Sequence, residues 1–469
     1  MRPSFLLLST SLLVDRVFKY TGLIRALAKH GDVCVWTSSL DDHASLSDWA
    51  GVEATVEAFP VVRPFRERPY NYLRRLNEFV WDYRLMAPSR VSMQKHVRDK
   101  RLPGQIRALK FPAKLLAYSG SETIFENALE RLLVSYPRST EATARLSVKR
   151  PSVLVSTGPF QFEQPGVFAA AKRLGIPTLA YIPSWDNVST KNRMVFKYDG
   201  YIVWNEQNKA ELLDFYPHAR DVPSYVVGAP QFDVFYSNRF KIDRESYCAE
   251  RQLRPDSKII VYSLGSPNFL KEHHGAIEIA RRVKIGHFGD AQLIVRPHPI
   301  HDNAEMREIF SGFGPNVRLQ RTPNAGKDLI KRTQDEAQII DWVNTFRHAD
   351  VVVNLSSTVT VDAAIFDTPV VNLDFDPQPG RFDQALINDV NHKWSHFKPI
   401  AESGGVWLVN DFDELENAIK TYLENPSLHA ADRKWIAAYV CGSLDGRCGE
   451  RMAEAIADFV SRTKKGDTK

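Results

Sequence analysis

Several segments in the second half of the chain carry residues suited to binding a phosphate ester. In Val295-Arg-Pro-His-Pro299, Arg296 and His298 flank a proline that stiffens the loop after a predicted strand. A guanidinium forms paired hydrogen bonds with phosphate oxygens, and an imidazole donates to them or moves a proton. A cationic surface loop is the simpler alternative, but the position at a strand's carboxyl end favours a ligand site.

A hydroxyl-rich turn follows another predicted strand. Ser356, Ser357 and Thr358 precede a predicted helix, where hydroxyl groups and free backbone amides suit an anion. These residues would also serve as an ordinary N-cap. Asp362 follows one and a half turns into the helix, where it would accept hydrogen bonds from ribose hydroxyls or remain a solvated acid.

Two glycine-containing segments add weaker signals. Tyr262-Ser-Leu-Gly-Ser266 ends a predicted strand, and Gly265, with Ser266 beside it, would let backbone amides approach a diphosphate. One glycine is a weaker indication than a full GxGxxG sequence. Val227-Gly-Ala-Pro-Gln-Phe-Asp233 has the pattern Gly-x-Pro-x-x-Asp, which also suits a simple turn.

Two loops in the first half carry acids suited to activating a hydroxyl group. Glu163 lies in Thr157–Pro165, and Asp186 lies in Ile182–Asn187. A general base of this kind deprotonates the acceptor in an inverting transferase. The alternatives are an Asx-turn or N-cap role for Asp186 and a first-turn helix acid for Glu163.

We expect no metal site, because the histidines lack HExxH and zinc-ribbon spacing. Asp374 and Asp376 follow a buried strand and are interpreted as part of a sugar- or acceptor-side loop. The sequence contains no GxSxG elbow and no Walker A motif, so hydrolase and P-loop interpretations lose their main support.

Alternating strands and helices must position these residues. This alternation is typical of parallel doubly wound sheets, and two complete sets predict an α/β protein of two tandem Rossmann-like domains. The expected strands of the first half are 4–9, 32–37, 152–157, 177–182, 200–204 and 224–228, with a helix over 15–30. The second half has expected strands at 258–263, 292–296, 316–319, 350–354, 369–373 and 405–409. Its expected helices are 273–285, 303–311, 335–348, 357–366 and 411–424.

These elements predict an acceptor domain over 1–230, a donor domain over 231–430, and a closing helix with a polar tail over 431–469. One final helix is expected over 430–462. Ligands bind at the carboxyl ends of the strands in open α/β sheets, so we expect two such domains to form a cleft.

The composition is that of an ordinary globular protein: 469 residues, 43% apolar and 25% charged. The four scattered cysteines predict reduced thiols in a cytoplasmic protein. No apolar run approaches the roughly 18–20 residues that cross a bilayer. The apolar N-terminus has no small-x-small cleavage site, which favours a buried strand over a signal peptide.

The net charge of +5 conceals an uneven distribution. Residues 61–115 contain fourteen Lys and Arg but four Asp and Glu, a net charge of +10, so the remainder carries −5. Aromatic residues are interleaved with this charge, which suits an anionic membrane surface better than nucleic acid. A solvated insertion without a partner is the plain alternative. The residues expected on a membrane- or acceptor-facing surface are Arg66, Arg68, Arg74, Arg75 and Trp81.

Together these segments resemble the nucleotide-sugar site of GT-B glycosyltransferases. In that family a Ser/Gly-rich turn leads to a helix carboxylate, usually Glu, seven residues before a Pro, as Asp362 stands to Pro369 here. The Arg-Pro-His-Pro, Gly-x-Pro-x-x-Asp and Ser-Ser-Thr-x-x-x-Asp elements are similar to those of bacterial capsule and Kdo-type transferases and of CDP-glycerol glycerophosphotransferases. The resemblance covers roughly 225–425 and the N-terminal strand and helix. Asp362 is one methylene shorter than the usual Glu, so its reach toward a ribose is shorter.

The resemblance implies a metal-independent, peripheral membrane enzyme of cell-envelope polysaccharide biosynthesis. It would move a sugar from a nucleotide-sugar to a glycan or lipid-linked acceptor, with no further cofactor and no nucleic-acid partner. The implied donor-binding residues are Gly265, Ser266, Arg296, His298, Ser356, Ser357, Thr358 and Asp362, and the implied catalytic residues are Asp186, Glu163 and His298. The alternatives are a CDP-glycerol-type polyol-phosphate transferase, a nucleotide-sugar 2-epimerase and a catalytically degenerate binding protein.

Overall fold

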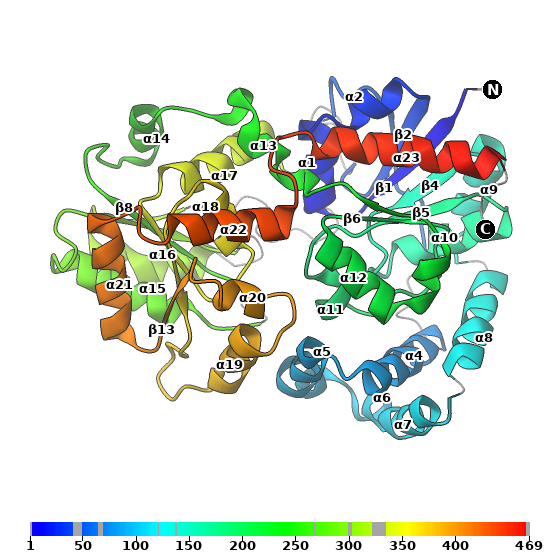
Figure 1. Ribbon diagram of the computed structural model, residues 1–469, viewed down its shortest axis with the longest axis horizontal. Helices are drawn as coiled ribbons and strands as arrows, with labels where there is room; N and C mark the ends of the chain where they lie inside the picture. The colour runs from blue at the N-terminus through cyan, green and yellow to red at the C-terminus, as the bar shows by residue number, and fades with distance from the viewer. Residues whose placement is uncertain are drawn as a thin grey trace. The chain divides into compact units, whose positions relative to one another are not determined.

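The computed structural model describes residues 2–40, 49–63, 69–120, 122–136, 138–266, 269–298, 303–320 and 334–465. The chain forms two compact units (Figure 1). Unit 1 comprises Met1–Asp233, Asp328–Gln334 and Cys441–Lys469, and unit 2 comprises Val234–Lys327 and Asp335–Val440. The first segment of unit 1 thus ends at Asp233, and the chain returns to this unit after unit 2.

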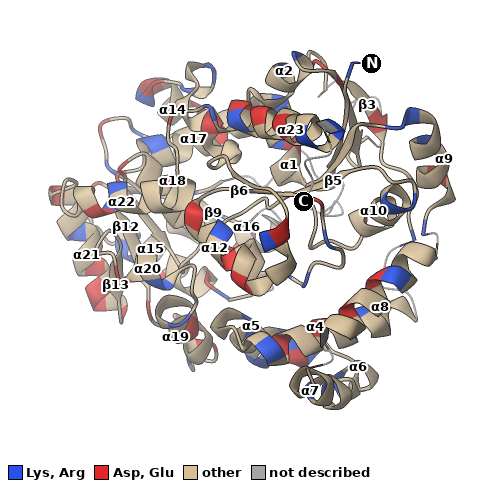
Figure 2. Ribbon diagram, turned by 45° about the vertical axis from the view of Figure 1, so that its right-hand side comes forward, with Lys and Arg blue, Asp and Glu red and all other residues tan. Residues whose placement is uncertain are grey.

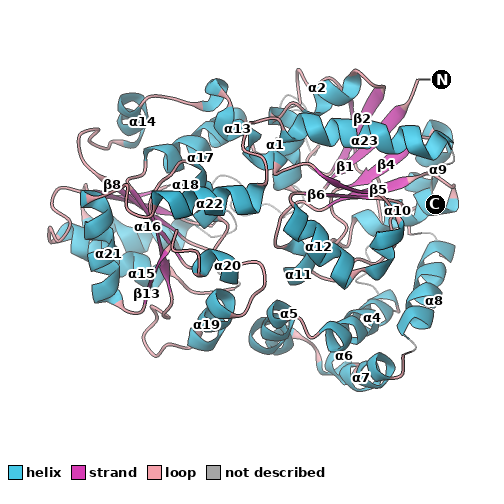
Figure 3. Cartoon of the chain, in the orientation of Figure 1, coloured by secondary structure: helices cyan, strands magenta, loops and turns pink. Residues whose placement is uncertain are grey.

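Unit 1 contains a seven-stranded parallel sheet in the order β3-β2-β1-β4-β5-β6-β7 (Figure 3). Its strands are β1 Ser4–Ser9, β2 Asp32–Thr37, β3 Thr55–Ala58, β4 Val153–Ser156, β5 Thr178–Tyr181, β6 Tyr201–Val203 and β7 Ser224–Val226. The central strands are buried on both faces and are therefore continuously apolar, as expected. The sequence analysis missed β3, a half-exposed edge strand that lacks such a run.

Helices cover this sheet: α1 Leu12–Tyr20, α2 Leu23–Ala28, α9 Thr140–Lys149, α10 Gln164–Arg173, α11 Asn187–Thr190, α12 Glu206–Phe215 and the short η3 Pro217–Asp221. The helix expected over 15–30 is thus two helices. They are interrupted at Thr21 and Gly22, where the last helix of the chain approaches closely. A Cβ on Gly22 would lie 3.1 Å from Cγ of Glu450, and one on Gly449 would lie 2.7 Å from Oγ1 of Thr21.

The basic segment folds as a set of helices, here called the helical insertion (70–135). It consists of α4 Tyr70–Leu85, α5 Pro88–Met93, η1 Gln94–Arg98, η2 Asp99–Arg101, α6 Gly104–Ala108, α7 Lys110–Tyr118 and α8 Glu122–Ser135. Trp81 of α4 joins the main core of unit 1. Phe79 and Val80 instead form a second small core with Ile106 and Ala113 of α6 and α7. Helices α6 and α7 therefore lie on the side of α4 away from the sheet (Figure 1).

Unit 2 contains a six-stranded parallel sheet in the order β10-β9-β8-β11-β12-β13. Its strands are β8 Ile259–Ser263, β9 Gln292–Arg296, β10 Val317–Leu319, β11 Val351–Asn354, β12 Val370–Leu373 and β13 Trp407–Val409. Its helices include α15 His273–Lys284, α16 Asn303–Phe310, α17 Glu336–His348, α18 Val359–Ile365, α19 Gln384–His392, α20 Lys398–Ala401 and α21 Phe412–Glu424. The strands and helices expected in the second half are confirmed. The junction forms η4 Pro230–Phe232, α13 Asp233–Tyr236, η5 Asn238–Phe240 and α14 Arg244–Arg251, and η6 Ser311–Phe313 follows α16.

The final segment differs from the expected single helix over 430–462. It forms α22 Ala430–Cys441, which belongs to unit 2 apart from its last residue, and α23 Cys448–Lys465, which belongs to unit 1. Gly442 and Gly446 interrupt the helix with φ angles of 69° and 71°, which favour glycine.

The Gly-x-Pro-x-x-Asp element, Gly228–Asp233, contacts the start of α23. The carboxylate of Asp233 accepts hydrogen bonds from the backbone amides of Cys448 at 3.0 Å and Gly449 at 2.7 Å, at the start of the helix. Gly228 has a φ of 87°, and a Cβ there would lie 2.5 Å from Sγ of Cys448. The motif therefore has a structural role within unit 1.

Candidate functional site

The strand order of unit 2 reverses between β8 and β11. From β8 the chain proceeds outward through β9 to β10, and from β11 it proceeds in the other direction through β12 to β13. Open α/β sheets bind ligands at the carboxyl ends of the strands beside such a switch point. The predicted donor-binding residues lie in the loops that follow β8, β9 and β11, apart from Arg296, which ends β9, and Asp362, which lies within α18.

Arg296 is the last residue of β9, and its Cα pairs with that of Ser263 at the end of β8. Its guanidinium carbon lies 5.5 Å from the centroid of the Phe346 ring. Within the described part of the chain, no carboxylate forms an ion pair with this half-buried cation. His298 is also half-buried and lies at the last described position of the same loop.

The turn after β11 is held in an unusual conformation. Ser356 has a φ of 51°, in the left-handed region that residues other than glycine rarely adopt. Its buried hydroxyl donates to Oδ1 of Asn391, whose Nδ2 donates to Oδ1 of Asp374 at 2.8 Å. Asn391 therefore connects this turn to the end of β12. Strain of this kind is frequent at functional sites.

Some donors of the hydroxyl-rich turn already form hydrogen bonds with a neighbouring residue. The amide and hydroxyl of Ser357 both donate to Oδ1 of Asn354, at 2.9 and 3.3 Å. Thr358 is exposed and precedes α18 without a side-chain capping bond. Of the three hydroxyl groups expected at a diphosphate, that of Thr358 is thus the exposed one.

Asp362 lies on the inner side of α18 and is buried. Its Oδ2 accepts a hydrogen bond of 3.3 Å from Nε1 of Trp342 on α17, and the Trp342 ring packs edge-on against Phe235. The alternative of a solvated helix acid is therefore wrong, and the ribose contact stays a prediction.

The glycine after β8 has a different role from the expected one. The amide of Gly265 donates to Oε1 of Glu272 at 3.1 Å, so it is not free for a diphosphate. A Cβ at this position would lie 2.4 Å from the same oxygen, which explains the requirement for glycine. Ser266, beside it, is half-buried, and its carbonyl accepts the amide of Phe269 at 2.8 Å.

Glu272 is a site residue that the sequence analysis missed. It directly precedes α15 and is only 4% exposed. Burial raises the pKa of its carboxyl to about 8, against the opposing effect of the Gly265 and Leu355 amides. Its place seven residues after the glycine, at the start of the next helix, is the signal that would have revealed it.

Some of the buried polar atoms without a hydrogen-bond partner belong to residues in or beside β8, β11 and β12. Among the described residues, Oη of Tyr262, Oε2 of Glu272, and Nδ2 of Asn354 and Asn372 have no hydrogen-bond partner. The Thr360 hydroxyl lies 3.3 Å from Oδ1 of Asn354 and 3.2 Å from Oδ1 of Asn372. Its one proton can form a hydrogen bond with only one of these two oxygens. Such atoms are rare in folded proteins and mark places where water or a ligand completes the bonding.

At the corresponding edge of unit 1, the loop after β4 is fixed by one glutamine. Gln164 accepts from Ser156, Thr157 and Gly158 through Oε1, at 2.8 to 3.1 Å, and its Nε2 donates to Thr10 and Thr157. This residue, also missed from the sequence, fixes the loop that carries Glu163. The half-buried Glu163 accepts the backbone amide of Phe162 at 3.1 Å.

The second predicted base, Asp186, is engaged locally. Its Oδ1 accepts from Ser184 and Asn187, and its Oδ2 accepts from Thr190 at 2.9 Å. All three donors are side chains, and Asp186 precedes α11 without a side-chain capping bond, so the N-cap alternative is wrong. A hydroxyl acceptor would have to displace one of these donors, so Glu163 is the less engaged of the two predicted bases.

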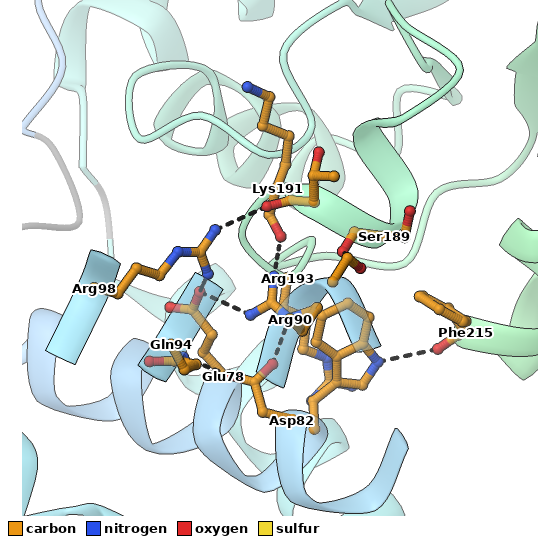
Figure 4. Close-up of polar contacts among 12 residues, drawn as sticks. Glu78, Asp82, Arg90, Gln94, Arg98, Ser189, Lys191, Arg193 and Phe215 are labelled. Atoms are coloured by element: carbon orange, nitrogen blue, oxygen red, sulfur yellow. Dashed lines mark hydrogen bonds and ion pairs between the residues drawn. The ribbon is translucent and has the colours of Figure 1, made fainter. Parts of the chain in front are cut away.

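In the helical insertion, four arginines surround the buried carboxylate of Glu78. Figure 4 shows two of them, Arg90 and Arg98, beside it. Arg74 and Arg75 lie 3.3 and 3.0 Å from Oε2 of Glu78, and Arg90 and Arg98 lie 3.1 and 3.3 Å from its Oε1. Burial alone would raise the pKa of Glu78, but the four guanidinium groups lower it to about 2. Asp82 forms a further ion pair with Arg90 and accepts from Gln94 at 2.7 Å.

The same cluster fastens the insertion to α11. The hydroxyl of Ser89 donates to the carbonyl of Ser189 at 2.7 Å, and Arg98 donates to that of Thr190 at 2.8 Å. Arg90 donates to the next carbonyl, that of Lys191 (Figure 4). These carbonyls end the helix that Asp186 precedes, so the insertion positions one of the acid-bearing loops.

The expected membrane-facing residues require a correction. Arg74 and Trp81 are buried, Arg75 is half-buried in the Glu78 cluster, and Arg66 and Arg68 lie outside the described residues. Trp81 stacks with the Arg90 guanidinium at 4.6 Å and donates to the carbonyl of Phe215 at 3.1 Å. Helical spacing places Arg74, Glu78 and Trp81 on one face of α4, which packs inward.

Among the described residues, no group of three or more His, Cys, Asp or Glu side chains is arranged to hold a metal ion.

No family model and no curated protein matches the sequence. Solved structures are nevertheless similar over almost the full chain. S. aureus MnaA, solved with UDP, has 12% identity and a TM-score of 0.54, covering 98% of this chain and 97% of that chain. UDP-GlcNAc 2-epimerase from Neisseria meningitidis, bound to UDP-GlcNAc, has 13% identity and a TM-score of 0.52, covering 98% and 100%. The epimerase from Methanocaldococcus jannaschii has 13% identity and a TM-score of 0.51 over the same shares. With its two parallel-sheet units, the chain therefore has the GT-B fold.

Proposed function

We propose that unit 2 binds a nucleotide-activated sugar at the carboxyl ends of β8, β9 and β11, and that the protein is a metal-independent glycosyltransferase. The observation that carries the proposal is the reversal of strand order between β8 and β11, because the strained turn of Ser356 and the cation of Arg296 lie at the carboxyl ends of the strands beside it. Proteins of the same fold have been solved with UDP and with UDP-GlcNAc, which supports this ligand class. The acceptor would be a glycan or a lipid-linked glycan of the cell envelope.

In this proposal Arg296 and His298 neutralise the charge that develops on the departing diphosphate. Thr358 and Ser266 contact the phosphates, together with the backbone of the Ser356–Ser357 turn, and Asp362 accepts from the ribose. Glu272 acts as a positioning residue, because it fixes the loop that contains Gly265.

Glu163 or Asp186 removes the proton from the acceptor's hydroxyl group. The hydroxyl oxygen bonds to the anomeric carbon of the sugar as the bond between that carbon and the diphosphate breaks. Glu163 is the preferred base, because its carboxylate is the less engaged of the two.

The test is nucleotide binding by the variant Arg296→Ala. Losing a charge-assisted hydrogen bond should weaken the affinity for UDP, GDP or CDP, whichever binds best, by about 10–100-fold in calorimetry. Arg281→Ala is the matched control, because Arg281 is an exposed arginine paired with Glu278 on α15. Equal affinity in the Arg296 variant and the wild type would refute the site. Failure of the wild type to bind any of the three would support the degenerate binding protein.

A nucleotide-sugar 2-epimerase is the second candidate, favoured by the likeness to solved UDP-GlcNAc 2-epimerases. Such an enzyme needs no acceptor, so conversion of UDP-GlcNAc to its 2-epimer by the protein alone, followed by NMR, would favour it. A strong preference for CDP-glycerol over UDP- and GDP-sugars would instead favour the polyol-phosphate transferase.

A further inference from the structure

Helix α7 presents an apolar stripe to solvent. Phe111, Leu115 and Tyr118 are 74%, 59% and 72% exposed, and their spacing of i, i+4 and i+7 places them on one face of the helix. We call these three residues the α7 face. Scattered single apolar residues are common on protein surfaces, whereas an aligned set is typical of a contact surface.

The opposite side of α7 attaches the helix to the rest of the insertion. Ala113 is fully buried, and Leu109, Leu116 and Ala117 pack with it against Phe79 and Val80 of α4. The helix therefore has two apolar sides, and its attachment to the insertion uses only one. Folding does not explain the α7 face.

Helices α6 and α7 carry Lys and Arg but no Asp or Glu, whereas α8 carries both signs (Figure 2). Lys95, Lys100, Arg107 and Lys114 are exposed on η1, η2, α6 and α7. Between Asp82 and Glu122 the sequence contains a single acid, Asp99, and its carboxylate pairs with Lys110. The arginines around Glu78 are paired with that carboxylate, whereas the exposed Lys114 and Arg107 lie on α7 itself and on the adjoining α6.

We propose that the α7 face docks the protein onto an anionic membrane surface. Aromatic and leucine side chains enter the boundary between headgroups and acyl chains, and flanking lysines and arginines attract anionic headgroups. A second copy is a poor partner for this face, because it would oppose the same cations. None of the described helices is both long and apolar enough to cross a bilayer.

This surface also gives the helical insertion a place in the proposed reaction. On its inner side, Arg74 stacks on Phe162 at 4.4 Å, next to Glu163, and Arg98 binds the carbonyl of Thr190 in the helix that Asp186 precedes. One set of helices thus connects the docking face to both acid-bearing loops, which suits a lipid-linked acceptor. This last step rests on the proposed function, whereas the docking itself does not.

The experiment is flotation of the full-length protein with vesicles of phosphatidylcholine, with and without phosphatidylglycerol. We expect binding that requires phosphatidylglycerol and weakens as salt rises. The triple variant Phe111→Ala/Leu115→Ala/Tyr118→Ala should lose about tenfold or more of this partitioning. Lys114→Glu with Arg107→Glu should weaken it on anionic vesicles alone.

The matched control is Val148→Ala/Ile285→Ala/Phe382→Ala, which removes three other exposed apolar side chains. It should float like the wild type, and thermal melting confirms that each variant is folded. The proposal is overturned if the wild type ignores lipid charge, or if the α7-face variant floats like the control. Nucleotide affinity measured without vesicles tests the proposed function separately, so either proposal can fail alone.

Discussion

Two glutamates of this protein are removed from solvent in opposite ways. Glu78 is enclosed by four guanidinium groups, which outweigh the effect of burial and lower its pKa to about 2. Glu272 accepts from backbone amides, and no cation among the described residues pairs with it, so burial prevails and its pKa rises to about 8. At neutral pH the first is a carboxylate and the second is largely a neutral acid.

The difference separates a structural region from a candidate ligand site. The charge of Glu78 is fully compensated by residues that also bind the carbonyls after α11, so its cluster joins two parts of unit 1. Glu272 has an oxygen without a partner among the described residues and lies at the switch point of unit 2. Perturbed acids of this second kind are more often functional.

The largest effect is expected from Glu78→Ala. It leaves Arg74, Arg90 and Arg98 near one another without the carboxylate, and breaking a buried ion pair costs about 3–5 kcal/mol. Urea unfolding should show a loss of stability in this range. Glu336→Ala is the control, because Glu336 pairs with Arg239 near the surface and should cost about 0–1 kcal/mol. A similarly small loss for Glu78→Ala would mean that the arginines relax into solvent, which would remove the distinction between the two glutamates.

The second prediction concerns pH and has opposite signs for the two acids. The folded protein keeps the Glu272 proton up to about pH 8, whereas the unfolded chain releases it near its ordinary pKa of 4.5. The stability from this group is therefore complete below the unfolded pKa and falls as pH rises toward 8, by at most about 1.4 kcal/mol per pH unit. Glu78 contributes stability above its unfolded pKa, which is lost as pH falls toward 2.

Urea unfolding of Glu272→Gln between pH 5 and pH 8 tests this sign. Because the amide mimics the protonated acid, the variant should approach the wild type at the acidic end of this range and become increasingly the more stable of the two toward about pH 8. Parallel stability curves would show that Glu272 is ionised in the folded protein, and the comparison with Glu78 would fail.

The smallest effect is expected from Gly265→Ala. The new methyl would overlap Oε1 of Glu272 at 2.4 Å, and such crowding typically costs about 1–3 kcal/mol. In the double variant with Glu272→Ala most of this cost should disappear, because the two residues are in contact. Gly312→Ala is the control, since a Cβ there meets nothing within 4 Å. Additive losses in urea unfolding would exclude a direct contact between Gly265 and Glu272.

The helices and strands of unit 2 were predicted more accurately than the helices that distant segments interrupt, for a physical reason. In unit 2, buried strands such as Val351–Asn354 and the helices between them follow from local apolar periodicity, which a sequence records directly. Where a distant segment approaches, the prediction was wrong. The contact of Gly449 with Thr21 accompanies the break between α1 and α2, and the glycines after α22 separate it from α23.

The sequence by itself determined the strand order along unit 2 with the helices between those strands, the segments that carry the candidate ligand-binding residues, and the concentration of positive charge in residues 61–115. Only the tertiary structure decided which of those charges are enclosed around Glu78 and which surround the α7 face. Only the tertiary structure also brought Glu272 against Gly265 and left its second oxygen without a partner. The reason is that apolar periodicity is a local property of the chain, whereas the partner of a charged or polar group depends on contacts such as Arg98 with Thr190, 92 positions apart.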